Sequence, residues 1–261
     1  MRRSLIFLYS SAAFIVFTIL IWYISVPTDL IKEKIEQTIS RSIGANTGVK
    51  ITGLEKGLFF SLHIDDLAID QRGAHIINAS DIAVQMNLLS LYKGNIGLDL
   101  NGNIGGGHIN GIFKEAGKGV IKADGIDISS LQYLKDLGIN CNGILSAETT
   151  LNNNSSETKF TVTGLSMKGG ALDILPLINS FRKAQGLIIA NRDQITVTSL
   201  SLDGDKGYAR AKGKIVNRSA DMVFELMPEF GKLEEFEKIL IKQYETSPGY
   251  YVFPYRGKLS I

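Results

Sequence analysis

The chain has 261 residues, with 28 lysines and arginines against 26 aspartates and glutamates, and it contains a single cysteine. Arg2 and Arg3 are the only charged residues before position 28, so residues 28–261 carry no formal net charge. A neutral body argues against a nucleic-acid-binding protein, which normally shows a basic patch, and one cysteine excludes an intramolecular disulfide.

The segment from Leu5 to Val26 is uncharged and rich in apolar and aromatic residues. A helix of this length reaches about 33 Å, enough to cross a hydrocarbon core of about 30 Å. The alternative is a cleaved signal peptide, but its apolar region usually has only about 7–15 residues and ends at a small-residue cleavage site. We therefore predict an uncleaved transmembrane helix over residues 5–26, with Leu5, Phe14, Trp22 and Val26 as anchor residues.

The positive-inside rule gives this anchor a direction, because Arg2 and Arg3 precede it. Residues 1–4 are then a short cytoplasmic tail, and residues 28–261 are exported. An amphipathic helix is predicted over residues 28–44, since aliphatic residues recur there at helical spacing between charged ones. This helix either packs on the exported body or lies on the membrane surface, and the mixed charges of its polar face favour packing.

From Val49 onward, apolar and polar residues tend to alternate, which is typical of strands with one buried face. The alternation predicts strands over residues 62–69, 82–88, 96–100, 109–113, 139–149, 160–167, 187–189, 195–202, 208–216, 222–226 and 250–261. A bulge near Asp65-Asp66 is predicted to change the buried side of the first of these strands. The 27 glycines and only 5 prolines also suit many strands joined by tight turns.

Three helices are predicted within this β-rich body: a short one over 129–137, one over 171–185 interrupted by Pro176, and one over 229–246. The third is strongly amphipathic, and its apolar face contains Phe230, Leu233, Phe236, Ile239, Leu240 and Tyr244. A weak repeat relates residues 98–113 to residues 200–215, and both copies read as a strand, a turn and a returning strand. Repeated hairpins of this kind favour one long antiparallel sheet.

Residues that could perform chemistry are scattered. His63, His75 and His108 do not show metal-ligand spacing with one another or with Cys141. Asp65 and Asp66 are neighbours in a predicted strand, so their side chains point to opposite sides. Cys141 has no evident catalytic partner and is interpreted as a small core residue. We therefore expect a protein that is not an enzyme, with no catalytic residue, metal site or cofactor.

The alternating strands place a stripe of apolar residues on one side of the predicted sheet. The candidate residues are Ile82, Val84, Met86, Leu98, Leu100, Phe113, Ile195, Val197, Leu200 and Leu202. An alternating pattern marks a buried face without showing what buries it. The stripe is therefore either an open apolar groove for a lipid or a core closed by the helices at 129–137 and 230–244.

Several motifs resemble those of a known family. After the anchor and the helix come Gly48-Val49-Lys50-Ile51, Gly53-Leu54-Glu55-Lys56-Gly57-Leu58-Phe59-Phe60 and Leu62-His63-Ile64-Asp65-Asp66-Leu67-Ala68-Ile69. Glycine-punctuated hairpins follow, and Pro254-Tyr255-Arg256-Gly257-Lys258-Leu259 closes the chain. Over essentially its whole length the chain resembles the AsmA-like bitopic proteins, and among them the GspN proteins of bacterial type II secretion systems.

This resemblance implies a single-pass protein of a bacterial inner membrane, with a periplasmic β domain over residues 49–261. The expected fold is mainly β, a long, strongly curved, U-shaped antiparallel sheet with an apolar concave face and a few packed helices. The implied function is an accessory, structural role in type II secretion; the alternative is binding or transfer of lipid in an apolar groove. Expected partners are the inner-membrane bilayer, other secretion components and a phospholipid or glycolipid, with no nucleic acid. The family offers no catalytic residues to carry over.

Overall fold

The computed structural model describes residues 14, 17–18, 21–43, 47–71, 74–87, 90, 94–95, 97–115, 117–132, 135, 140–168, 177–191, 194–217 and 219–258. The chain divides after Asn103 into two compact units. Unit 1 comprises residues 1–103 and unit 2 comprises residues 104–261.

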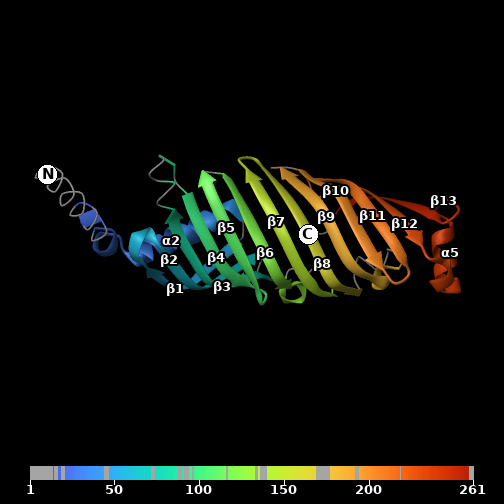
Figure 1. Cartoon of the computed structure of the whole chain (residues 1–261), viewed down its shortest axis with the longest axis horizontal. Coiled ribbons are helices and arrows are strands. Elements are labelled where there is room, and N and C mark those ends of the chain that lie inside the picture. Colours follow the sequence, from blue (N-terminus) through green and yellow to red (C-terminus); the bar gives the residue numbers. More distant parts are fainter. Residues whose placement is uncertain are drawn as a thin grey trace, which may run out of the picture. The chain divides into compact units, whose positions relative to one another are not determined.

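The dominant element is an antiparallel sheet of 14 strands, which confirms the mainly β fold predicted from the sequence. The strands keep sequence order from β1 to β12, and only the last two exchange places, so that β14 pairs with β12 and β13 lies outside it. Within each unit, consecutive strands up to β12 therefore lie side by side (Figure 1). The order is open, with β1 and β13 as its end strands. Strand order does not fix curvature, so the U shape implied by the resemblance stays a prediction.

Unit 1 contains a long helix and the first strands. Residues 21–25 are helical, and the elements after them in the described part of this unit include α2 (Thr28–Ile43), β1 (Thr47–Lys56), the 3-10 helix η1 (Leu58–Phe60), β2 (Leu62–Gln71), β3 (Ala74–Asn87) and β4 (Gly97–Ile104), whose last residue belongs to unit 2. The bounds of α2 confirm the helix predicted over 28–44. The helix begins directly after Pro27, a residue that favours a helix start. Its predicted end, Gly44, lies outside the described residues.

The helix α2 packs along the end strand β1, as predicted. The Ser40 hydroxyl donates to the backbone carbonyl of Thr47 (2.6 Å), and the Glu36 carboxylate accepts from the backbone N–H of Ile51 (2.8 Å). An end strand has a row of backbone groups without a neighbouring strand, and such groups invite pairing with another chain. The helix therefore supplies side-chain partners to the free edge of β1.

The burial pattern along β2 shifts by one residue near Asp65-Asp66, where the sequence predicts an irregularity. Ile64 and Ile69 are both buried although they lie five positions apart, a spacing that puts side chains on opposite sides of a regular strand. The predicted bulge is wrong, however, because β2 keeps the same register with β1 and β3 across this point. The irregularity instead lies in the two neighbours, where Gly53 and Asp81 have φ angles of +63° and +51°.

Unit 2 contains ten strands and short helices. The strands are β5 (Gly107–Glu115), β6 (Lys118–Asp127), β7 (Asn140–Asn152), β8 (Ser155–Lys168), β9 (Phe181–Asn191), β10 (Gln194–Gly204), β11 (Gly207–Val216), β12 (Ser219–Pro228), β13 (Glu245–Ser247) and β14 (Tyr250–Lys258). The short helices are η2 (Ile128–Ser130), η4 (Ile178–Ser180), η5 (Phe230–Lys232) and α5 (Glu235–Lys242). Both copies of the weak repeat fold as two consecutive strands joined by a two-residue turn.

Two predicted helices of unit 2 differ from the structure. The helix predicted over 129–137 begins one residue early as the 3-10 helix η2, and Gln132 and Lys135 are α-helical; residues 133–134 and 136–139 lie outside the described residues. The helix predicted over 171–185 is wrong from residue 181 onward, because the short 3-10 helix η4 leads into β9; residues 171–176 lie outside the described residues. Strand β9 pairs with β8 and with β10, and pairing on both sides overrides the local helical pattern.

The helix predicted over 229–246 is shorter than expected. It is broken into η5 and α5, and the residues after α5 form β13, which pairs with β14. Leu233 and Ile241 are buried, whereas Phe236, Ile239 and Leu240 of the predicted apolar face are exposed by 67%, 70% and 43%. The helix starts at a capping box in which Glu234 and Glu237 satisfy each other's backbone N–H groups.

A salt-bridge cluster ties α5 to the turn between β10 and β11. The Lys206 ammonium lies 2.6 Å from the Glu237 carboxylate and 3.5 Å from that of Glu234. The backbone carbonyl of Lys206 also accepts from the N–H of Glu229 (2.8 Å). One turn thus holds the start of η5 and the start of α5 together.

Most of the predicted membrane span, including its anchor residue Leu5, lies outside the described residues. Among the residues that the structure describes, no helix combines the length and the apolar character needed to cross a membrane. Phe14 is exposed, and Trp22 stacks on Phe60 with ring centroids 5.2 Å apart. The Lys56 ammonium donates to the carbonyls of Tyr23 (2.7 Å) and Val26 (2.6 Å).

Candidate functional site

The most extensive feature of unit 2 is an apolar face formed by rows of paired residues. Residues directly opposite each other in antiparallel strands have side chains on the same face. From β7 to β12 and on to β14, row 1 contains Leu145, Val162, Ala184, Leu202, Ala209, Leu226 and Tyr251; row 2 contains Ala147, Phe160, Gly186, Leu200, Ala211, Phe224 and Phe253. Row 3 contains Thr149, Thr158, Ile188, Val197, Gly213, Met222 and Tyr255; row 4 contains Leu151, Ser156, Ala190, Ile195, Ile215, Ala220 and Gly257. These four rows are called the apolar face.

A bulge keeps this face continuous along β10. Val197 and Leu202 are both buried although their spacing is odd, which would put them on opposite sides of a regular strand. The pairing register shifts by one residue between Val197 and Leu200, and the extra residue restores the alternation. Ile195, Val197, Leu200 and Leu202 therefore lie on one side, as the sequence predicts.

The opposite face of the same strands is polar. One of its rows contains Lys122, Glu148 and Lys159, and the ammonium of Lys122 lies 3.2 Å from the Glu148 carboxylate. Another contains Ser201, Arg210 and Glu225. The sheet of unit 2 thus has an apolar and a polar side, as alternation in the sequence predicts.

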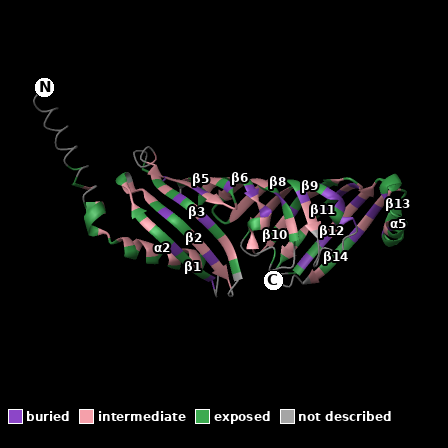
Figure 2. Cartoon of the chain, turned by 90° about the horizontal axis from the view of Figure 1, so that it is seen from below, coloured by how far each residue is buried: buried purple, intermediate pink, exposed green. Residues whose placement is uncertain are grey.

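One end of the apolar face is closed. Most of row 1 is buried, and buried positions recur along the strands of unit 2 (Figure 2). The side chains that complete this buried cluster come from the connecting segments and include Ile128 of η2, Ile178 of η4, Leu233 after η5 and Ile241 of α5. This part of the face is a core under short helices, the second of the two alternatives that the sequence left open.

The other end of the apolar face is more open. Along row 4, Leu151, Ala190 and Ile215 are half-buried and Ile195 is 40% exposed, whereas Ala220 on β12 is buried in a small cluster with Val197 and Met222. Phe113 of β5 extends this row through Gly119 and is also half-buried. The face therefore passes from a closed core at row 1 to an accessible apolar surface along most of row 4. The predicted closed core and the predicted open groove each describe a part of it.

The predicted groove residues fall into two sets. Phe113, Ile195, Val197, Leu200 and Leu202 all belong to the apolar face of unit 2. The other five belong to unit 1: Ile82, Val84 and Met86 on β3, and Leu98 and Leu100 on β4. In unit 1, Ile82 is buried opposite Ile64 of β2, and the remaining four are half-buried.

Three small side chains with hydroxyl groups interrupt the apolar face at the β7–β8 side of its open half, and the sequence analysis did not find them. The hydroxyls of Thr149 and Thr158 are hydrogen-bonded to each other across β7 and β8 (3.0 Å), and Ser156 follows in row 4. These three residues are called the hydroxyl patch. The spacing of Ser156 and Thr158 in the sequence puts them on one side of a strand. Only the strand register shows that they meet Thr149 on the apolar side.

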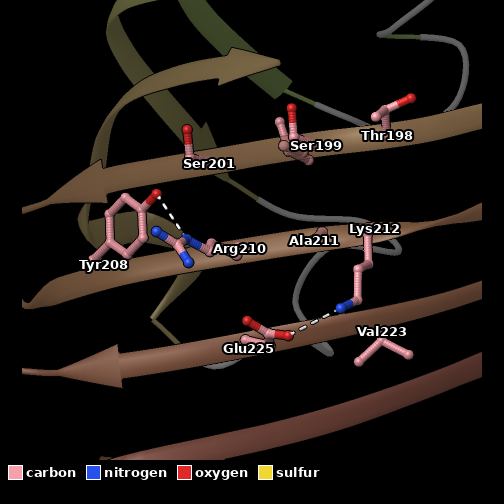
Figure 3. A pocket seen from close by; sticks show the side chains of 10 residues that line it. Thr198, Ser199, Ser201, Tyr208, Arg210, Ala211, Lys212, Val223 and Glu225 are labelled. Atoms are coloured by element: carbon pink, nitrogen blue, oxygen red, sulfur yellow. Dashed lines mark hydrogen bonds and ion pairs between the residues drawn. The ribbon is translucent and has the colours of Figure 1, made fainter. Parts of the chain in front are cut away.

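The polar face has a shallow hollow of about 380 Å³ beside the bulge of β10 (Figure 3). The Arg210 guanidinium donates to the Tyr208 hydroxyl (3.2 Å), a contact that raises the pKa of Arg210, and Lys212 pairs with Glu225 (3.6 Å). The cations that line this hollow thus already have partners on the protein. A charged ligand would have to compete with them in open solvent, where ion pairs contribute little.

In the described part of the chain, the residues considered for catalysis form at most exposed pairs, such as His63 with Asp65 (3.5 Å). Cys141 packs against the buried cluster of unit 2, which confirms its interpretation as a core residue. Burial, and secondarily Asp127, raise the pKa of its thiol, so the nucleophilic thiolate is disfavoured. His75 pairs with Asp70 (2.7 Å) at the surface. Within the described ranges, no group of three His, Cys, Asp or Glu residues is placed to hold a metal ion.

Comparison of the chain with models of protein families, with curated proteins and with solved structures finds no match.

Proposed function

We propose that this protein binds the acyl chains of a lipid on the apolar face of unit 2. The observation that carries the proposal is the change from a closed core at row 1 to half-buried and exposed aliphatic side chains at row 4. A core that only stabilised the fold would be expected to be covered along its whole length. An accessible apolar surface next to a closed one resembles a groove with a blind end.

The energetics favour such a surface. An acyl chain that leaves a bilayer loses about 0.8 kcal/mol per CH₂, so a chain of about fourteen carbons loses on the order of 10 kcal/mol unless another apolar surface receives it. Aliphatic rows on adjacent strands offer that surface without any reactive group. Lipid binding or transfer therefore requires neither a cofactor nor catalysis, and we propose a role without enzymatic activity.

We further propose the setting that the sequence implies. Residues 5–26 would anchor the chain in a bacterial inner membrane, and residues 28–261 would lie in the periplasm. A strongly curved, U-shaped AsmA-like sheet would place the apolar face on its concave side, with a phospholipid or glycolipid as the ligand. The neutral charge balance of residues 28–261 supports a partner other than nucleic acid.

Two matched variants test the lipid proposal. Ile195 and Val216 have similar exposures, 40% and 39%, but Ile195 lies in row 4 and Val216 on the opposite face. Ile195→Asp should weaken lipid binding by at least about tenfold, because a carboxylate disfavours burial under an acyl chain. Val216→Asp should leave it unchanged. Native mass spectrometry of the detergent-extracted full chain measures the bound lipid, and equal loss in both variants would contradict the proposal.

A second candidate function is a structural role in a type II secretion system. Strand addition at the sheet ends is disfavoured. Helix α2 supplies partners to β1, and at the other end the three-residue strand β13 pairs only with the start of β14, beyond which Pro254 of β14 lacks the N–H that a further strand would need. What favours a protein partner is the exposed apolar side of α5, with Phe236, Ile239 and Leu240.

Deletion of the gene tests this second candidate. We expect release of folded exoproteins to stop while bulk lipid composition stays normal, and complementation with a Phe236→Ser, Ile239→Ser, Leu240→Ser variant should fail to restore release. Complementation with Ile195→Asp serves as the control and should restore it. Normal secretion in the deletion strain would rule the role out.

A further inference from the structure

The hydroxyl patch is the main polar feature among the aliphatic side chains of the open half of the apolar face. Thr149 and Thr158 face each other in row 3, and Ser156 lies two residues before Thr158 on the same strand, in row 4. All three are half-buried, and their row neighbours on the flanking strands are Ala190 and Ile188 of β9. A ligand lying along rows 3 and 4 would therefore pass over these hydroxyls.

The Thr149–Thr158 contact has a chemical consequence. In a hydrogen bond between two hydroxyls, one O–H donates and the other oxygen accepts. The accepting hydroxyl keeps its own proton, so the pair retains one donor for a third group. Inside an apolar surface, such a donor favours a ligand that brings an acceptor, because an unmet polar group in an apolar setting is costly.

We propose that the hydroxyl patch recognises the ester carbonyls of a diacyl lipid, which would place the glycerol end of the lipid at the patch and lay its acyl chains along the open half of the apolar face. This inference rests on the proposed lipid-binding function and adds the chemical class of the ligand. An ester carbonyl is a good hydrogen-bond acceptor at the junction between head group and acyl chain. An ether linkage at the same place has no carbonyl.

The polar face provides a matched control. Thr150 and Thr161 lie on the same two strands, β7 and β8, and on the opposite side of the sheet. Threonine-to-valine changes keep the β-branched shape that strands favour and remove only the hydroxyl. A general effect of removing two threonines from these strands would therefore appear in the control as well.

The experiment compares dipalmitoyl phosphatidylcholine with its dihexadecyl ether analogue, each titrated against the full chain in detergent and followed by native mass spectrometry. The wild type should prefer the ester lipid by about three- to tenfold, the effect of one net hydrogen bond. A variant without the hydroxyl patch, in which Thr149→Val and Thr158→Val are combined with Ser156→Ala, should bind both lipids equally. Thr150→Val with Thr161→Val should keep the preference, and so should Thr149→Ser with Thr158→Ser, because serine restores the hydroxyls.

The outcomes separate the two proposals. Equal binding of ester and ether lipids by the wild type would overturn the hydroxyl-patch inference and leave lipid binding standing. A preference that persists in the variant without the hydroxyl patch would also overturn it. Failure of the wild type to bind either lipid would instead overturn the proposed function, and this inference with it.

Discussion

At the scale of single residues, two neighbours on α5 differ sharply in what they contribute. The Ile241 side chain is fully buried in the closed core of unit 2, whereas Leu240 is 43% exposed. Truncation of a buried aliphatic side chain costs both its transfer free energy and the cavity that it leaves. Ile241→Ala should therefore lower the free energy of unfolding by about 2–5 kcal/mol.

Leu240→Ala provides the control, because surface substitutions usually change stability by less than about 0.5 kcal/mol. Denaturant unfolding of both variants, followed by circular dichroism, measures the difference. Equal destabilisation by the two changes would show that α5 does not pack through Ile241.

The positions of single residues could be predicted where alternation alone decides them. The four predicted residues of β10 do share one face, although a bulge stands between Val197 and Leu200. The hydroxyl patch could not be predicted, because the meeting of Thr149 with Thr158 depends on strand register, which a sequence pattern fixes only weakly. The Thr residues also suit any strand position by their β-branched shape, so their type gave no further signal.

At the scale of elements, the connection between α5 and the β10–β11 turn depends on pH. Burial alone would raise the pKa of Glu237, but hydrogen bonds from Lys206 (2.6 Å) and from the backbone N–H of Glu234 (2.8 Å) outweigh it, and the pKa lies below its ordinary value. A carboxylate with a lowered folded-state pKa stabilises the fold above its unfolded-state pKa of about 4.3. This contribution is lost as the pH falls through the lower folded-state value.

Glu237→Gln should therefore be less stable than the wild type at pH 6, and the difference should shrink toward pH 3. Thermal unfolding midpoints at the two pH values measure it. The matched control is Glu235→Gln, since Glu235 pairs with Lys238 at 86% exposure and exposed pairs add little. A difference that grew on acidification would contradict the role of Glu237.

Strands were easier to predict from the sequence than helices. Alternation marks a strand directly, whereas the predicted helices at 171–185 and 229–246 compete with pairing partners that the local sequence does not reveal. Residues 181–185 join β9 because β8 and β10 pair with it, and residues 245–247 leave the predicted helix to pair with β14. Apolar residues do recur at helical spacing in the second segment. However, α5 starts after a break, and it buries Ile241, whereas Phe236 of the predicted apolar face is exposed.

At the scale of the whole molecule, alternation and the weak repeat were sufficient to predict one long antiparallel sheet, and the 14-strand order confirms it. The exchange of β13 and β14 could not be predicted, because the segment between β12 and β14 contains the helical pattern of residues 229–246. The sequence also left open whether the apolar stripe was a groove or a core. In unit 2 it is closed at one end and accessible at the other, since the buried cluster that includes the short helices takes its strand residues mainly from rows 1 and 2.

The covered edge of β1 and the proline in β14 have a consequence for copies of the chain. A sheet that grows by adding strands needs free N–H and C=O groups at its margin. Glu36 and Ser40 occupy such groups on β1. At the other end, the three-residue strand β13 covers only the start of β14, and Pro254 interrupts the row of donors on the rest of β14. Molecules at high concentration should therefore resist polymerisation into fibres by strand addition, so that each sheet contains the strands of one polypeptide.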